Sequence, residues 1–313
     1  MTECERIISE GVLPASFFEP ETICDFYVTK ERKKIWAVAL DLLFKFDDVC
    51  RRHNLKYSLA FGSLLGAIRH NGFIPWDDDI DVVMPRVDYE KLRQLKKEFE
   101  NPYFLQYPGE DEGYLFSFAK LRNSLTSGIS WAFRYEDFNQ GLFLDIFPLD
   151  NYSPENIDLN MERIAQLVAE CSARMRRSCP IPDDNDKQKL AQFPVVRDVQ
   201  TLSTEMNNVL RQYEAMETDK YIIWSCLFYS TNKIIYDKAW FDELIDHNLY
   251  GYPVLIPTHF DNVLRTTYGD YLQYPPINQR GTWHSSAIFD PDVPYKEVIV
   301  DLKNKDNIII LPR

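Results

Sequence analysis

A run of acidic residues that leads directly into a buried strand constrains this chain more than any other feature of its sequence. Four aspartates stand within residues 77–81, immediately before the apolar run 82–84. Side chains alternate between the two faces of a strand, so a strand that begins near Asp79 directs Asp79 and Asp81 to one face and Ile80 into the core. Two carboxylates on one face repel each other, and a divalent cation is the usual remedy. We therefore expect a metal site here, with a solvated acidic turn as the alternative.

A Gly-Ser pair precedes this run, at the point where an expected strand over 56–61 gives way to a helical turn or two over 64–70. Gly62 would let the backbone approach a phosphate closely, and the amide and hydroxyl of Ser63 can both donate hydrogen bonds to it. Turns of this kind are common, so the pair gains its meaning from the aspartates that follow. Together the two features predict a site that binds phosphate through a metal ion.

A third carboxylate, Asp145, is the one charged side chain in the apolar run 142–147. Leaving it buried without a partner would cost several kcal/mol. We expect it either to pair with an arginine or a backbone amide, or to join Asp79 and Asp81 as a third metal ligand. Asp150 follows the proline that is expected to end this strand, and is expected to cap a loop.

The pattern of expected elements indicates a mixed α/β (α+β) protein. We expect an N-terminal arm over 1–29, a core over 30–150, a helical insertion over 151–220 and a C-terminal return over 221–313 that completes the core. Apolar residues recur at intervals of three and four from 30 to 54, which predicts a helix with Thr29 as its N-cap. The other expected elements are helices over 86–100 and 259–268, two or more helices in the insertion, strands over 79–84, 103–107, 114–121, 141–147, 221–229, 239–244 and 254–257, and a mostly extended tail from residue 275.

An excess of acidic residues narrows the range of partners. Asp and Glu number 48 against 35 Lys and Arg, which gives a formal net charge of −13. Nucleic-acid binding needs a basic surface that displaces counterions, so the composition excludes this class of partner. The longest apolar stretch, 222–229, is far shorter than the ~20 residues that span a bilayer. The cysteines form no CxxC pair, and the charged N-terminus is unlike a signal peptide. We expect a cytoplasmic protein, either free or peripheral to the inner face of the membrane.

Several segments are more specific than any single residue. They are 61–70, 72–81, 145–150, 268–271, Pro275-Pro276 and His284. In these segments the sequence resembles the LicD family, whose relatives include fukutin and fukutin-related protein. The resemblance covers about 30–150 and 260–285, and none of its motifs falls in the insertion. The family is similar to the nucleotidyltransferase superfamily in its Gly-Ser turn, Asp-x-Asp strand and third aspartate.

This resemblance implies a nucleotidyltransferase-like mixed sheet with flanking helices. It also implies transfer of phosphocholine from CDP-choline to a hydroxyl of a cell-surface glycan or a lipid-linked oligosaccharide, with release of CMP. Mg²⁺ or Mn²⁺ would be held by Asp79, Asp81 and Asp145, which would be the catalytic residues. The alternative is transfer of ethanolamine phosphate, ribitol phosphate or glycerol phosphate, each from its own CDP donor. Two further alternatives are a glycosyltransferase that holds a nucleotide-sugar through a metal, and a catalytically silent glycan- or nucleotide-binding protein.

Positively charged side chains are expected to supplement the metal. Lys120 and Arg122 alternate on one expected strand, so both could face the donor diphosphate, and Arg69 lies close in sequence to the aspartates. His284, in the polar tail, is expected to contact phosphate or the acceptor. The alternative for Lys120, Arg122 and Arg69 is a salt bridge on the surface. The alternative for His284 is a surface position without a role in binding.

A choline headgroup would need a cage of aromatic rings. Trp131 and Tyr135 belong to one run of alternating aromatic residues, and Trp76 directly precedes the aspartates. Aromatic residues make up 14% of the chain, so packing in the core is the alternative for all three.

Overall fold

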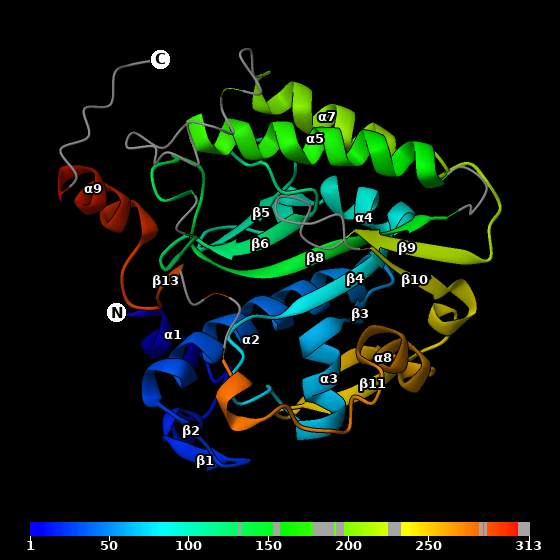
Figure 1. Cartoon of the computed structure of the whole chain (residues 1–313). Helices are drawn as coiled ribbons and strands as arrows, with labels where there is room; N and C mark the ends of the chain where they lie inside the picture. The colour runs from blue at the N-terminus through cyan, green and yellow to red at the C-terminus, as the bar shows by residue number, and fades with distance from the viewer. Residues whose placement is uncertain are drawn as a thin grey trace.

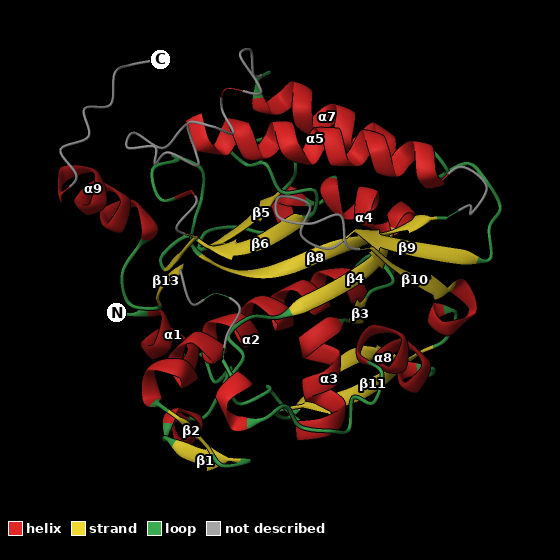
Figure 2. Cartoon of the chain, in the orientation of Figure 1, coloured by secondary structure: helices red, strands yellow, loops and turns green. Residues whose placement is uncertain are grey.

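The structure is a computed structural model, and it describes residues 1–130, 133–152, 157–177, 191, 197–224, 233–281, 284 and 287–305. A mixed seven-stranded sheet forms its centre, and helices cover both faces of that sheet (Figures 1 and 2). The expected mixed α/β class is therefore confirmed.

Strand β8 (Leu142–Asn151) is the axis of the sheet. On one side it pairs in parallel with β4 (Asp81–Pro85), and β3 (Ser58–Leu59) pairs antiparallel with β4. On the other side it pairs antiparallel with β6 (Ala119–Asn123) and, further along, with β9 (Lys220–Trp224). The other strands are β5 (Tyr103–Gln106) beside β6, β10 (Lys233–Asp237) beside β9, and the pairs β1 (Glu21–Ile23) with β2 (Phe26–Val28), β7 (Ser127–Ser130) with β13 (Ala287–Asp290) and β11 (Leu244–Leu249) with β12 (Tyr252–Pro257).

Helices form a layer on each face of this sheet. Helix α2 contacts β6 and β8 from one face, while α5 and α7 lie against each other over the opposite face (Figure 1). The apolar core is divided accordingly into a large cluster around α2 and a smaller one beneath α5 and α7. No helix in the described part of the chain has the length and apolar character needed to cross a bilayer. The α-helices are α1 (Glu3–Ser9), α2 (Lys30–Arg52), α3 (Phe61–His70), α4 (Arg86–Arg93), α5 (Ile157–Arg177), α7 (Val199–Leu210), α8 (Phe260–Tyr268) and α9 (Tyr295–Lys305).

Helix α2 follows the expectation from its sequence closely. The Thr29 hydroxyl accepts a hydrogen bond from the backbone N–H of Arg32 at 3.2 Å, as an N-cap does. Glu31 stands in the first turn and Arg51 and Arg52 in the last, where each charge is favourable to the helix dipole. The helix predicted over 30–54 is thus confirmed to within two residues.

Strand β8 runs through Pro148, so the prediction that this proline ends the strand is wrong. Backbone N–H groups alternate between the two sides of a strand, and that of Asp145 points towards β4, where it donates to the Ile80 carbonyl at 2.8 Å. The N–H that Pro148 lacks would therefore point to the opposite side. There the pairing with β6 ends at Ile146 and the pairing with β9 begins at Asp150. The proline falls in the gap between them, where no neighbour needs its N–H.

Other predicted elements differ from the structure because of contacts between distant segments. The tail from residue 275 is not mostly extended, since it contains a 3₁₀ turn (Ile277–Gln279), then β13 and α9. A 3₁₀ turn (Lys238–Phe241) replaces the first half of the strand predicted over 239–244. The helix predicted over 86–100 ends at Arg93, and the strand predicted over 114–121 begins only at Ala119, where pairing with β8 starts.

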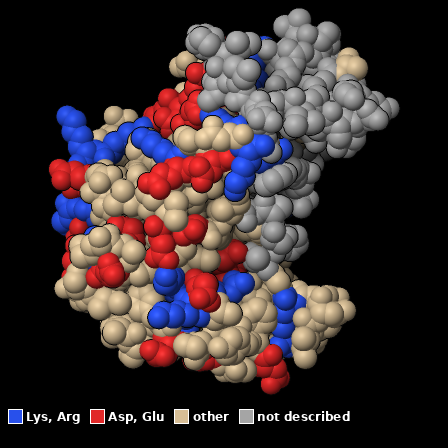
Figure 3. All heavy atoms as spheres, turned by 90° about the vertical axis from the view of Figure 1, so that its left-hand side faces the viewer, with Lys and Arg blue, Asp and Glu red and all other residues tan. Residues whose placement is uncertain are grey.

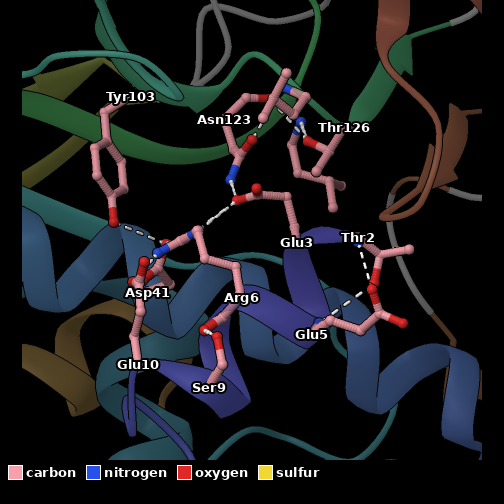
Figure 4. A network of polar contacts seen from close by, with 12 residues as sticks. Thr2, Glu3, Glu5, Arg6, Ser9, Glu10, Asp41, Tyr103, Asn123 and Thr126 are labelled. Carbon is pink, nitrogen blue, oxygen red and sulfur yellow. Dashed lines mark hydrogen bonds and ion pairs between the residues drawn. The ribbon is translucent and has the colours of Figure 1, made fainter.

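The N-terminal arm is anchored to the core by a polar network, drawn in Figure 4. Arg6 of α1 donates to Asp41 of α2 at 2.5 Å and to Glu3 at 3.1 Å. Asn123 at the end of β6 donates to Glu3 at 2.6 Å, and the Tyr103 hydroxyl donates to Asp41 at 3.0 Å. These bonds join the first helix to α2 and to two strands, so the arm is held by buried charge pairs as well as by apolar contacts.

Candidate active site

Three carboxylates meet at the start of β4. Ligand oxygens of Asp79, Asp81 and Asp145 all lie within 4.8 Å of one another. Asp81 and Asp145 are direct neighbours in the parallel register of β4 and β8. Asp79 reaches the same place from the loop, because β4 begins at Asp81 and not near Asp79 as the sequence predicts. The structure thus brings together the three residues that the sequence nominates as metal ligands.

The Gly-Ser pair lies in the first turn of α3, not at the end of a strand as expected. The Ser63 hydroxyl accepts a hydrogen bond from the backbone N–H of Asp81 at 2.8 Å, which ties the helix start to the aspartates. A Cβ atom on Gly62 would lie 2.5 Å from Oδ2 of Asp77. Gly62, Ser63, Asp77 and Asp79 also line one small pocket. The glycine at 62 therefore leaves room for the carboxylate of Asp77 against α3.

Replacing Gly62 with alanine should therefore displace the carboxylate of Asp77. We expect Gly62→Ala to lower the catalytic rate about 100-fold, the usual effect of a displacement of about 1 Å at an active site, with little change in melting temperature. Gly281→Ala is the matched control, since no atom of the described residues lies within 4 Å of its added Cβ. Equal rates in the two variants would show that the close packing around Gly62 has no part in activity.

Lys120 joins the carboxylate group from β6. It stands opposite Asp145 in the antiparallel register and forms an ion pair with it, and both side chains are buried. Its Nζ lies 3.5 Å from the centre of the Phe143 ring. Burial lowers the pKa of Lys120, and the charge of Asp145 opposes this shift. Asp145 therefore pairs with a lysine, not with the arginine or backbone amide that was one expectation, and it also belongs to the carboxylate group. Its role as a metal ligand stays a prediction.

Arg122 is also buried, two residues further along β6. Its Nε donates to Gln106 at 2.6 Å and its Nη1 to the Gly141 carbonyl at 2.9 Å. These bonds hold the guanidinium beside the site, 5.4 Å from the centre of the Phe143 ring. The surface salt bridge that was the alternative for Lys120 and Arg122 is wrong for both residues.

His284 reaches the aspartates from the C-terminal segment. Its Nδ1 lies 2.9 Å from Asp78 and 3.8 Å from Asp79, so these three residues form a second group with metal-ligand spacing. Burial by itself would lower its pKa, but the hydrogen bond to Asp78 and the charge of Asp79 raise the pKa of His284 to about 9. The histidine is therefore an inward-facing cation and not an ordinary surface residue.

The buried carboxylates repel one another, which favours their protonated forms. Burial raises the pKa values of Asp77, Asp79 and Asp81, and neighbouring aspartates raise them further. Lys120 and His284 offset only part of this repulsion. Carboxylate oxygens are the ligands that Mg²⁺ and Mn²⁺ prefer, and a bound cation would favour the ionised forms of these groups. The side chains present therefore fit the expected metal.

Two predicted ligand-binding residues point elsewhere. Arg69, in the last turn of α3, donates through Nη1 to the carbonyls of Tyr271 and Gln273 at 2.7 and 3.2 Å. The ring of Trp76 is buried, and the guanidinium of Arg280 lies 4.9 Å from its centre. A cation already occupies this ring, so Trp76 does not offer an open face to a choline headgroup.

The other cage residues give less information. Trp131 lies outside the described residues. Tyr135 is half-buried, and the guanidinium of Arg134 lies 4.4 Å from the centre of its ring. The roles of Trp131 and Tyr135 in a choline cage remain predictions.

The structure adds residues that sequence reasoning did not select. Asp77 and Asp78 belong to the aspartate run, yet their contacts with Gly62 and His284 depend on chain reversals that no local pattern reveals. Tyr268, at the end of α8, is 43% exposed. Partial burial and the charges of Asp81 and Asp77 raise the pKa of Tyr268. The motif 268–271 is the signal that could have identified it.

Comparison with known proteins agrees with this geometry. Residues 54–165 match the family model described as LicD/FKTN/FKRP, nucleotidyltransferase domain. Lipopolysaccharide cholinephosphotransferase LicD of Haemophilus influenzae is 28% identical over 263 residues, which are 79% of this chain and 93% of that protein.

Two uncharacterized Rickettsia proteins are similar over shorter stretches. The protein from Rickettsia prowazekii is 40% identical over 83 residues, which are 25% of this chain and 30% of that protein. The protein from Rickettsia typhi is 28% identical over 143 residues, which are 42% of this chain and 44% of that protein. The family match over 54–165 includes the Gly-Ser pair and all three carboxylates of the site, so the chain is similar to the LicD family in the residues that form this site.

Proposed function

We propose that this protein transfers phosphocholine from CDP-choline to a hydroxyl group of a glycan and releases CMP. The observation that carries the proposal is the group of Asp79, Asp81 and Asp145, in a chain similar to a cholinephosphotransferase over most of its length. A donor diphosphate is negatively charged and can approach three carboxylates only when a cation lies between them. The group therefore supports a metal-dependent reaction on a diphosphate donor.

Each side chain of the site has a separate proposed role in the transfer of phosphocholine. When bound, Mg²⁺ or Mn²⁺ would supply the positive charge that neutralises the diphosphate and the departing CMP. Asp79, Asp81 and Asp145 would hold it. Lys120 keeps a further positive charge beside Asp145, and Ser63 fixes the backbone at Asp81. The acceptor oxygen bonds to the β-phosphorus as the bond from that phosphorus to the CMP oxygen breaks, and the hydroxyl proton passes to a carboxylate of the group.

The acceptor and the cellular location are broader proposals. We propose a glycan or lipid-linked oligosaccharide as acceptor, because the name of the Haemophilus influenzae relative refers to lipopolysaccharide. A cytoplasmic protein, free or peripheral to the membrane, remains the prediction from sequence.

The test measures the CMP that the purified protein releases from CDP-choline, CDP-ethanolamine, CDP-ribitol and CDP-glycerol. Consumption of UDP-glucose is measured beside them as the test of a sugar donor. Each donor is incubated with Mg²⁺, with Mn²⁺ and with EDTA, since slow transfer to water reports the donor when the acceptor is absent. We expect release from CDP-choline that depends on metal. Faster release from another CDP-alcohol would change the headgroup but keep the reaction class.

Two results would overturn the proposal. Turnover of UDP-glucose in place of the CDP donors would favour a glycosyltransferase. CMP release that is equally fast with EDTA would remove the metal from the reaction. If no donor is consumed, binding of the same donors with Mg²⁺ is measured by thermal shift, and absence of binding would favour the catalytically silent alternative.

A further inference from the structure

A group of arginine side chains lies near the C-terminal end of α3, away from the carboxylates. Arg69 and Arg280 both face the ring of Tyr274, with their Cζ atoms 4.8 and 5.7 Å from its centre. Arg280 also covers Trp76. Arg32 stands over Phe26, the aromatic neighbour of Trp76. The three arginines come from α2, from α3 and from the segment after residue 277, so the fold gathers them from distant parts of the chain. We call Arg32, Arg69 and Arg280 the arginine cluster.

These three guanidinium groups are held in place without being neutralised. Within the described ranges, none of them has a carboxylate within 4.0 Å, whereas arginines such as Arg86 and Arg197 form such pairs. Their partners are backbone carbonyls instead. Arg32 donates to Asp77 at 2.8 Å, Arg69 donates to Tyr271 and Gln273, and Arg280 donates to Cys24 at 2.6 Å and Pro275 at 3.0 Å. In every case Nη2 donates no hydrogen bond within the described part of the chain, so it is available to a ligand.

The charge of the cluster is unusual for this chain. The protein carries a net charge of −13, and acidic side chains are plentiful enough to neutralise any arginine. Burial lowers the pKa of His70 to about 4, and the charges of Arg69 and Arg280 add to this effect. The neutral His70 ring is available to accept a hydrogen bond from Nε of Arg69 at 3.1 Å. Arg69 and Arg280 share the ring of Tyr274, with spare donors and no counter-charge, and two like charges held in this way indicate a site for an anion.

We infer that the arginine cluster binds a phosphate monoester group, which lies on the acceptor and not on the nucleotide donor. Six residues of α3 separate Ser63 from Arg69, which is about 9 Å along the helix axis. A diphosphate held at the carboxylate group would be too short to reach the cluster as well. Spare N–H donors on more than one positively charged group suit the several oxygens and two charges of a phosphate better than the two oxygens of a carboxylate. On the face shown in Figure 3 acidic and basic side chains are interspersed, so its described part offers no broad basic surface for a polyanion.

The binding of phosphate does not depend on the proposed reaction, but the assignment to the acceptor does. The test is therefore isothermal titration calorimetry of the full chain in EDTA, with glucose 1-phosphate as the probe and neither metal nor CDP donor present. We expect binding at millimolar concentrations, weakened at least about tenfold by Arg280→Gln and by Arg69→Gln. Arg280→Lys keeps the positive charge but loses the planar guanidinium group. Its affinity for glucose 1-phosphate should therefore fall between those of the wild-type protein and Arg280→Gln.

The controls distinguish this site from other sources of binding. Arg265→Gln removes an arginine that is paired with Asp261 on the surface, and should leave binding unchanged. Failure of the wild-type protein to bind glucose 1-phosphate would overturn the inference, as would full binding by Arg280→Gln. Glucuronate bound as tightly as glucose 1-phosphate would overturn the choice of phosphate. Tighter binding by Asp79→Asn, which removes a carboxylate that repels anions, would place the anion at the carboxylate group. CMP release can fail or succeed independently of all these results.

Discussion

Asp81→Asn should abolish catalysis and at the same time stabilise the metal-free protein. Asp81 is a neighbour of Asp145 in the sheet, and its oxygen lies within 4.8 Å of those of Asp79 and Asp145. Losing a metal ligand removes several kcal/mol of transition-state stabilisation, so CMP release should fall at least about 1,000-fold. A neutral amide also removes one of the repelling charges, so the melting temperature in EDTA should rise.

The rise in melting temperature caused by Asp81→Asn should be larger at neutral pH than at acidic pH. Burial, followed by the charges of Asp79, Asp145 and Asp77, raises the pKa of Asp81 well above its usual value of 3.8. The folded state therefore binds this proton more tightly than the unfolded state, and stability is lost as pH rises from about 4 through the raised pKa. The amide introduced by Asp81→Asn does not titrate, so the variant should gain most at neutral pH in EDTA and little at pH 4.

The measurement is a set of melting curves in EDTA from pH 4 to pH 8, beside CMP release with Mg²⁺. Asp48→Asn makes the same change of charge at a 50% exposed side chain on α2 and should alter neither result. A melting temperature for Asp81→Asn that differs from wild type by the same amount at every pH would contradict the repulsion. Wild-type rates of CMP release would contradict the role of Asp81 in binding metal.

Arg86→Met should be the most destabilising of these substitutions. Nε and Nη2 of Arg86 donate to the two oxygens of Asp150, each at 2.7 Å, and both side chains are almost fully buried. Burial raises the pKa of Asp150, and Arg86 opposes that shift, so removing the arginine leaves an uncompensated carboxylate in the core. Breaking a buried pair of this kind costs about 3–5 kcal/mol.

Urea unfolding of three variants tests this expectation. Arg86→Met should lower the unfolding free energy by the amount given above, and Arg86→Met with Asp150→Leu should recover most of it because no buried charge remains. Arg52→Met, which breaks exposed ion pairs with Asp48 and Glu98, should cost at most about 1 kcal/mol. If Arg86→Met costs no more than Arg52→Met, the buried pair is not important to stability.

Local patterns predicted a large part of the fold and the centre of the site. The interval of three and four in α2, with Thr29 before it, is a property of a single helix. The alternation after residue 79 and the lone charge of Asp145 in an apolar strand are properties of single strands. Each of these signals needs only near neighbours in sequence, because burial of one face of one element is enough to produce it.

The rest depends on which distant segments meet. Pro148 is acceptable in β8 only because β6 ends before it and β9 begins after it. His284 joins the aspartates only because β13 pairs with β7 and brings the C-terminal segment back to the core. The sequence by itself determined which residue types form the carboxylate group and the helix that begins beside them. The tertiary structure decided the partners of Lys120, Asp150 and the arginine cluster, because strand register and chain reversal arise from the packing of the whole core.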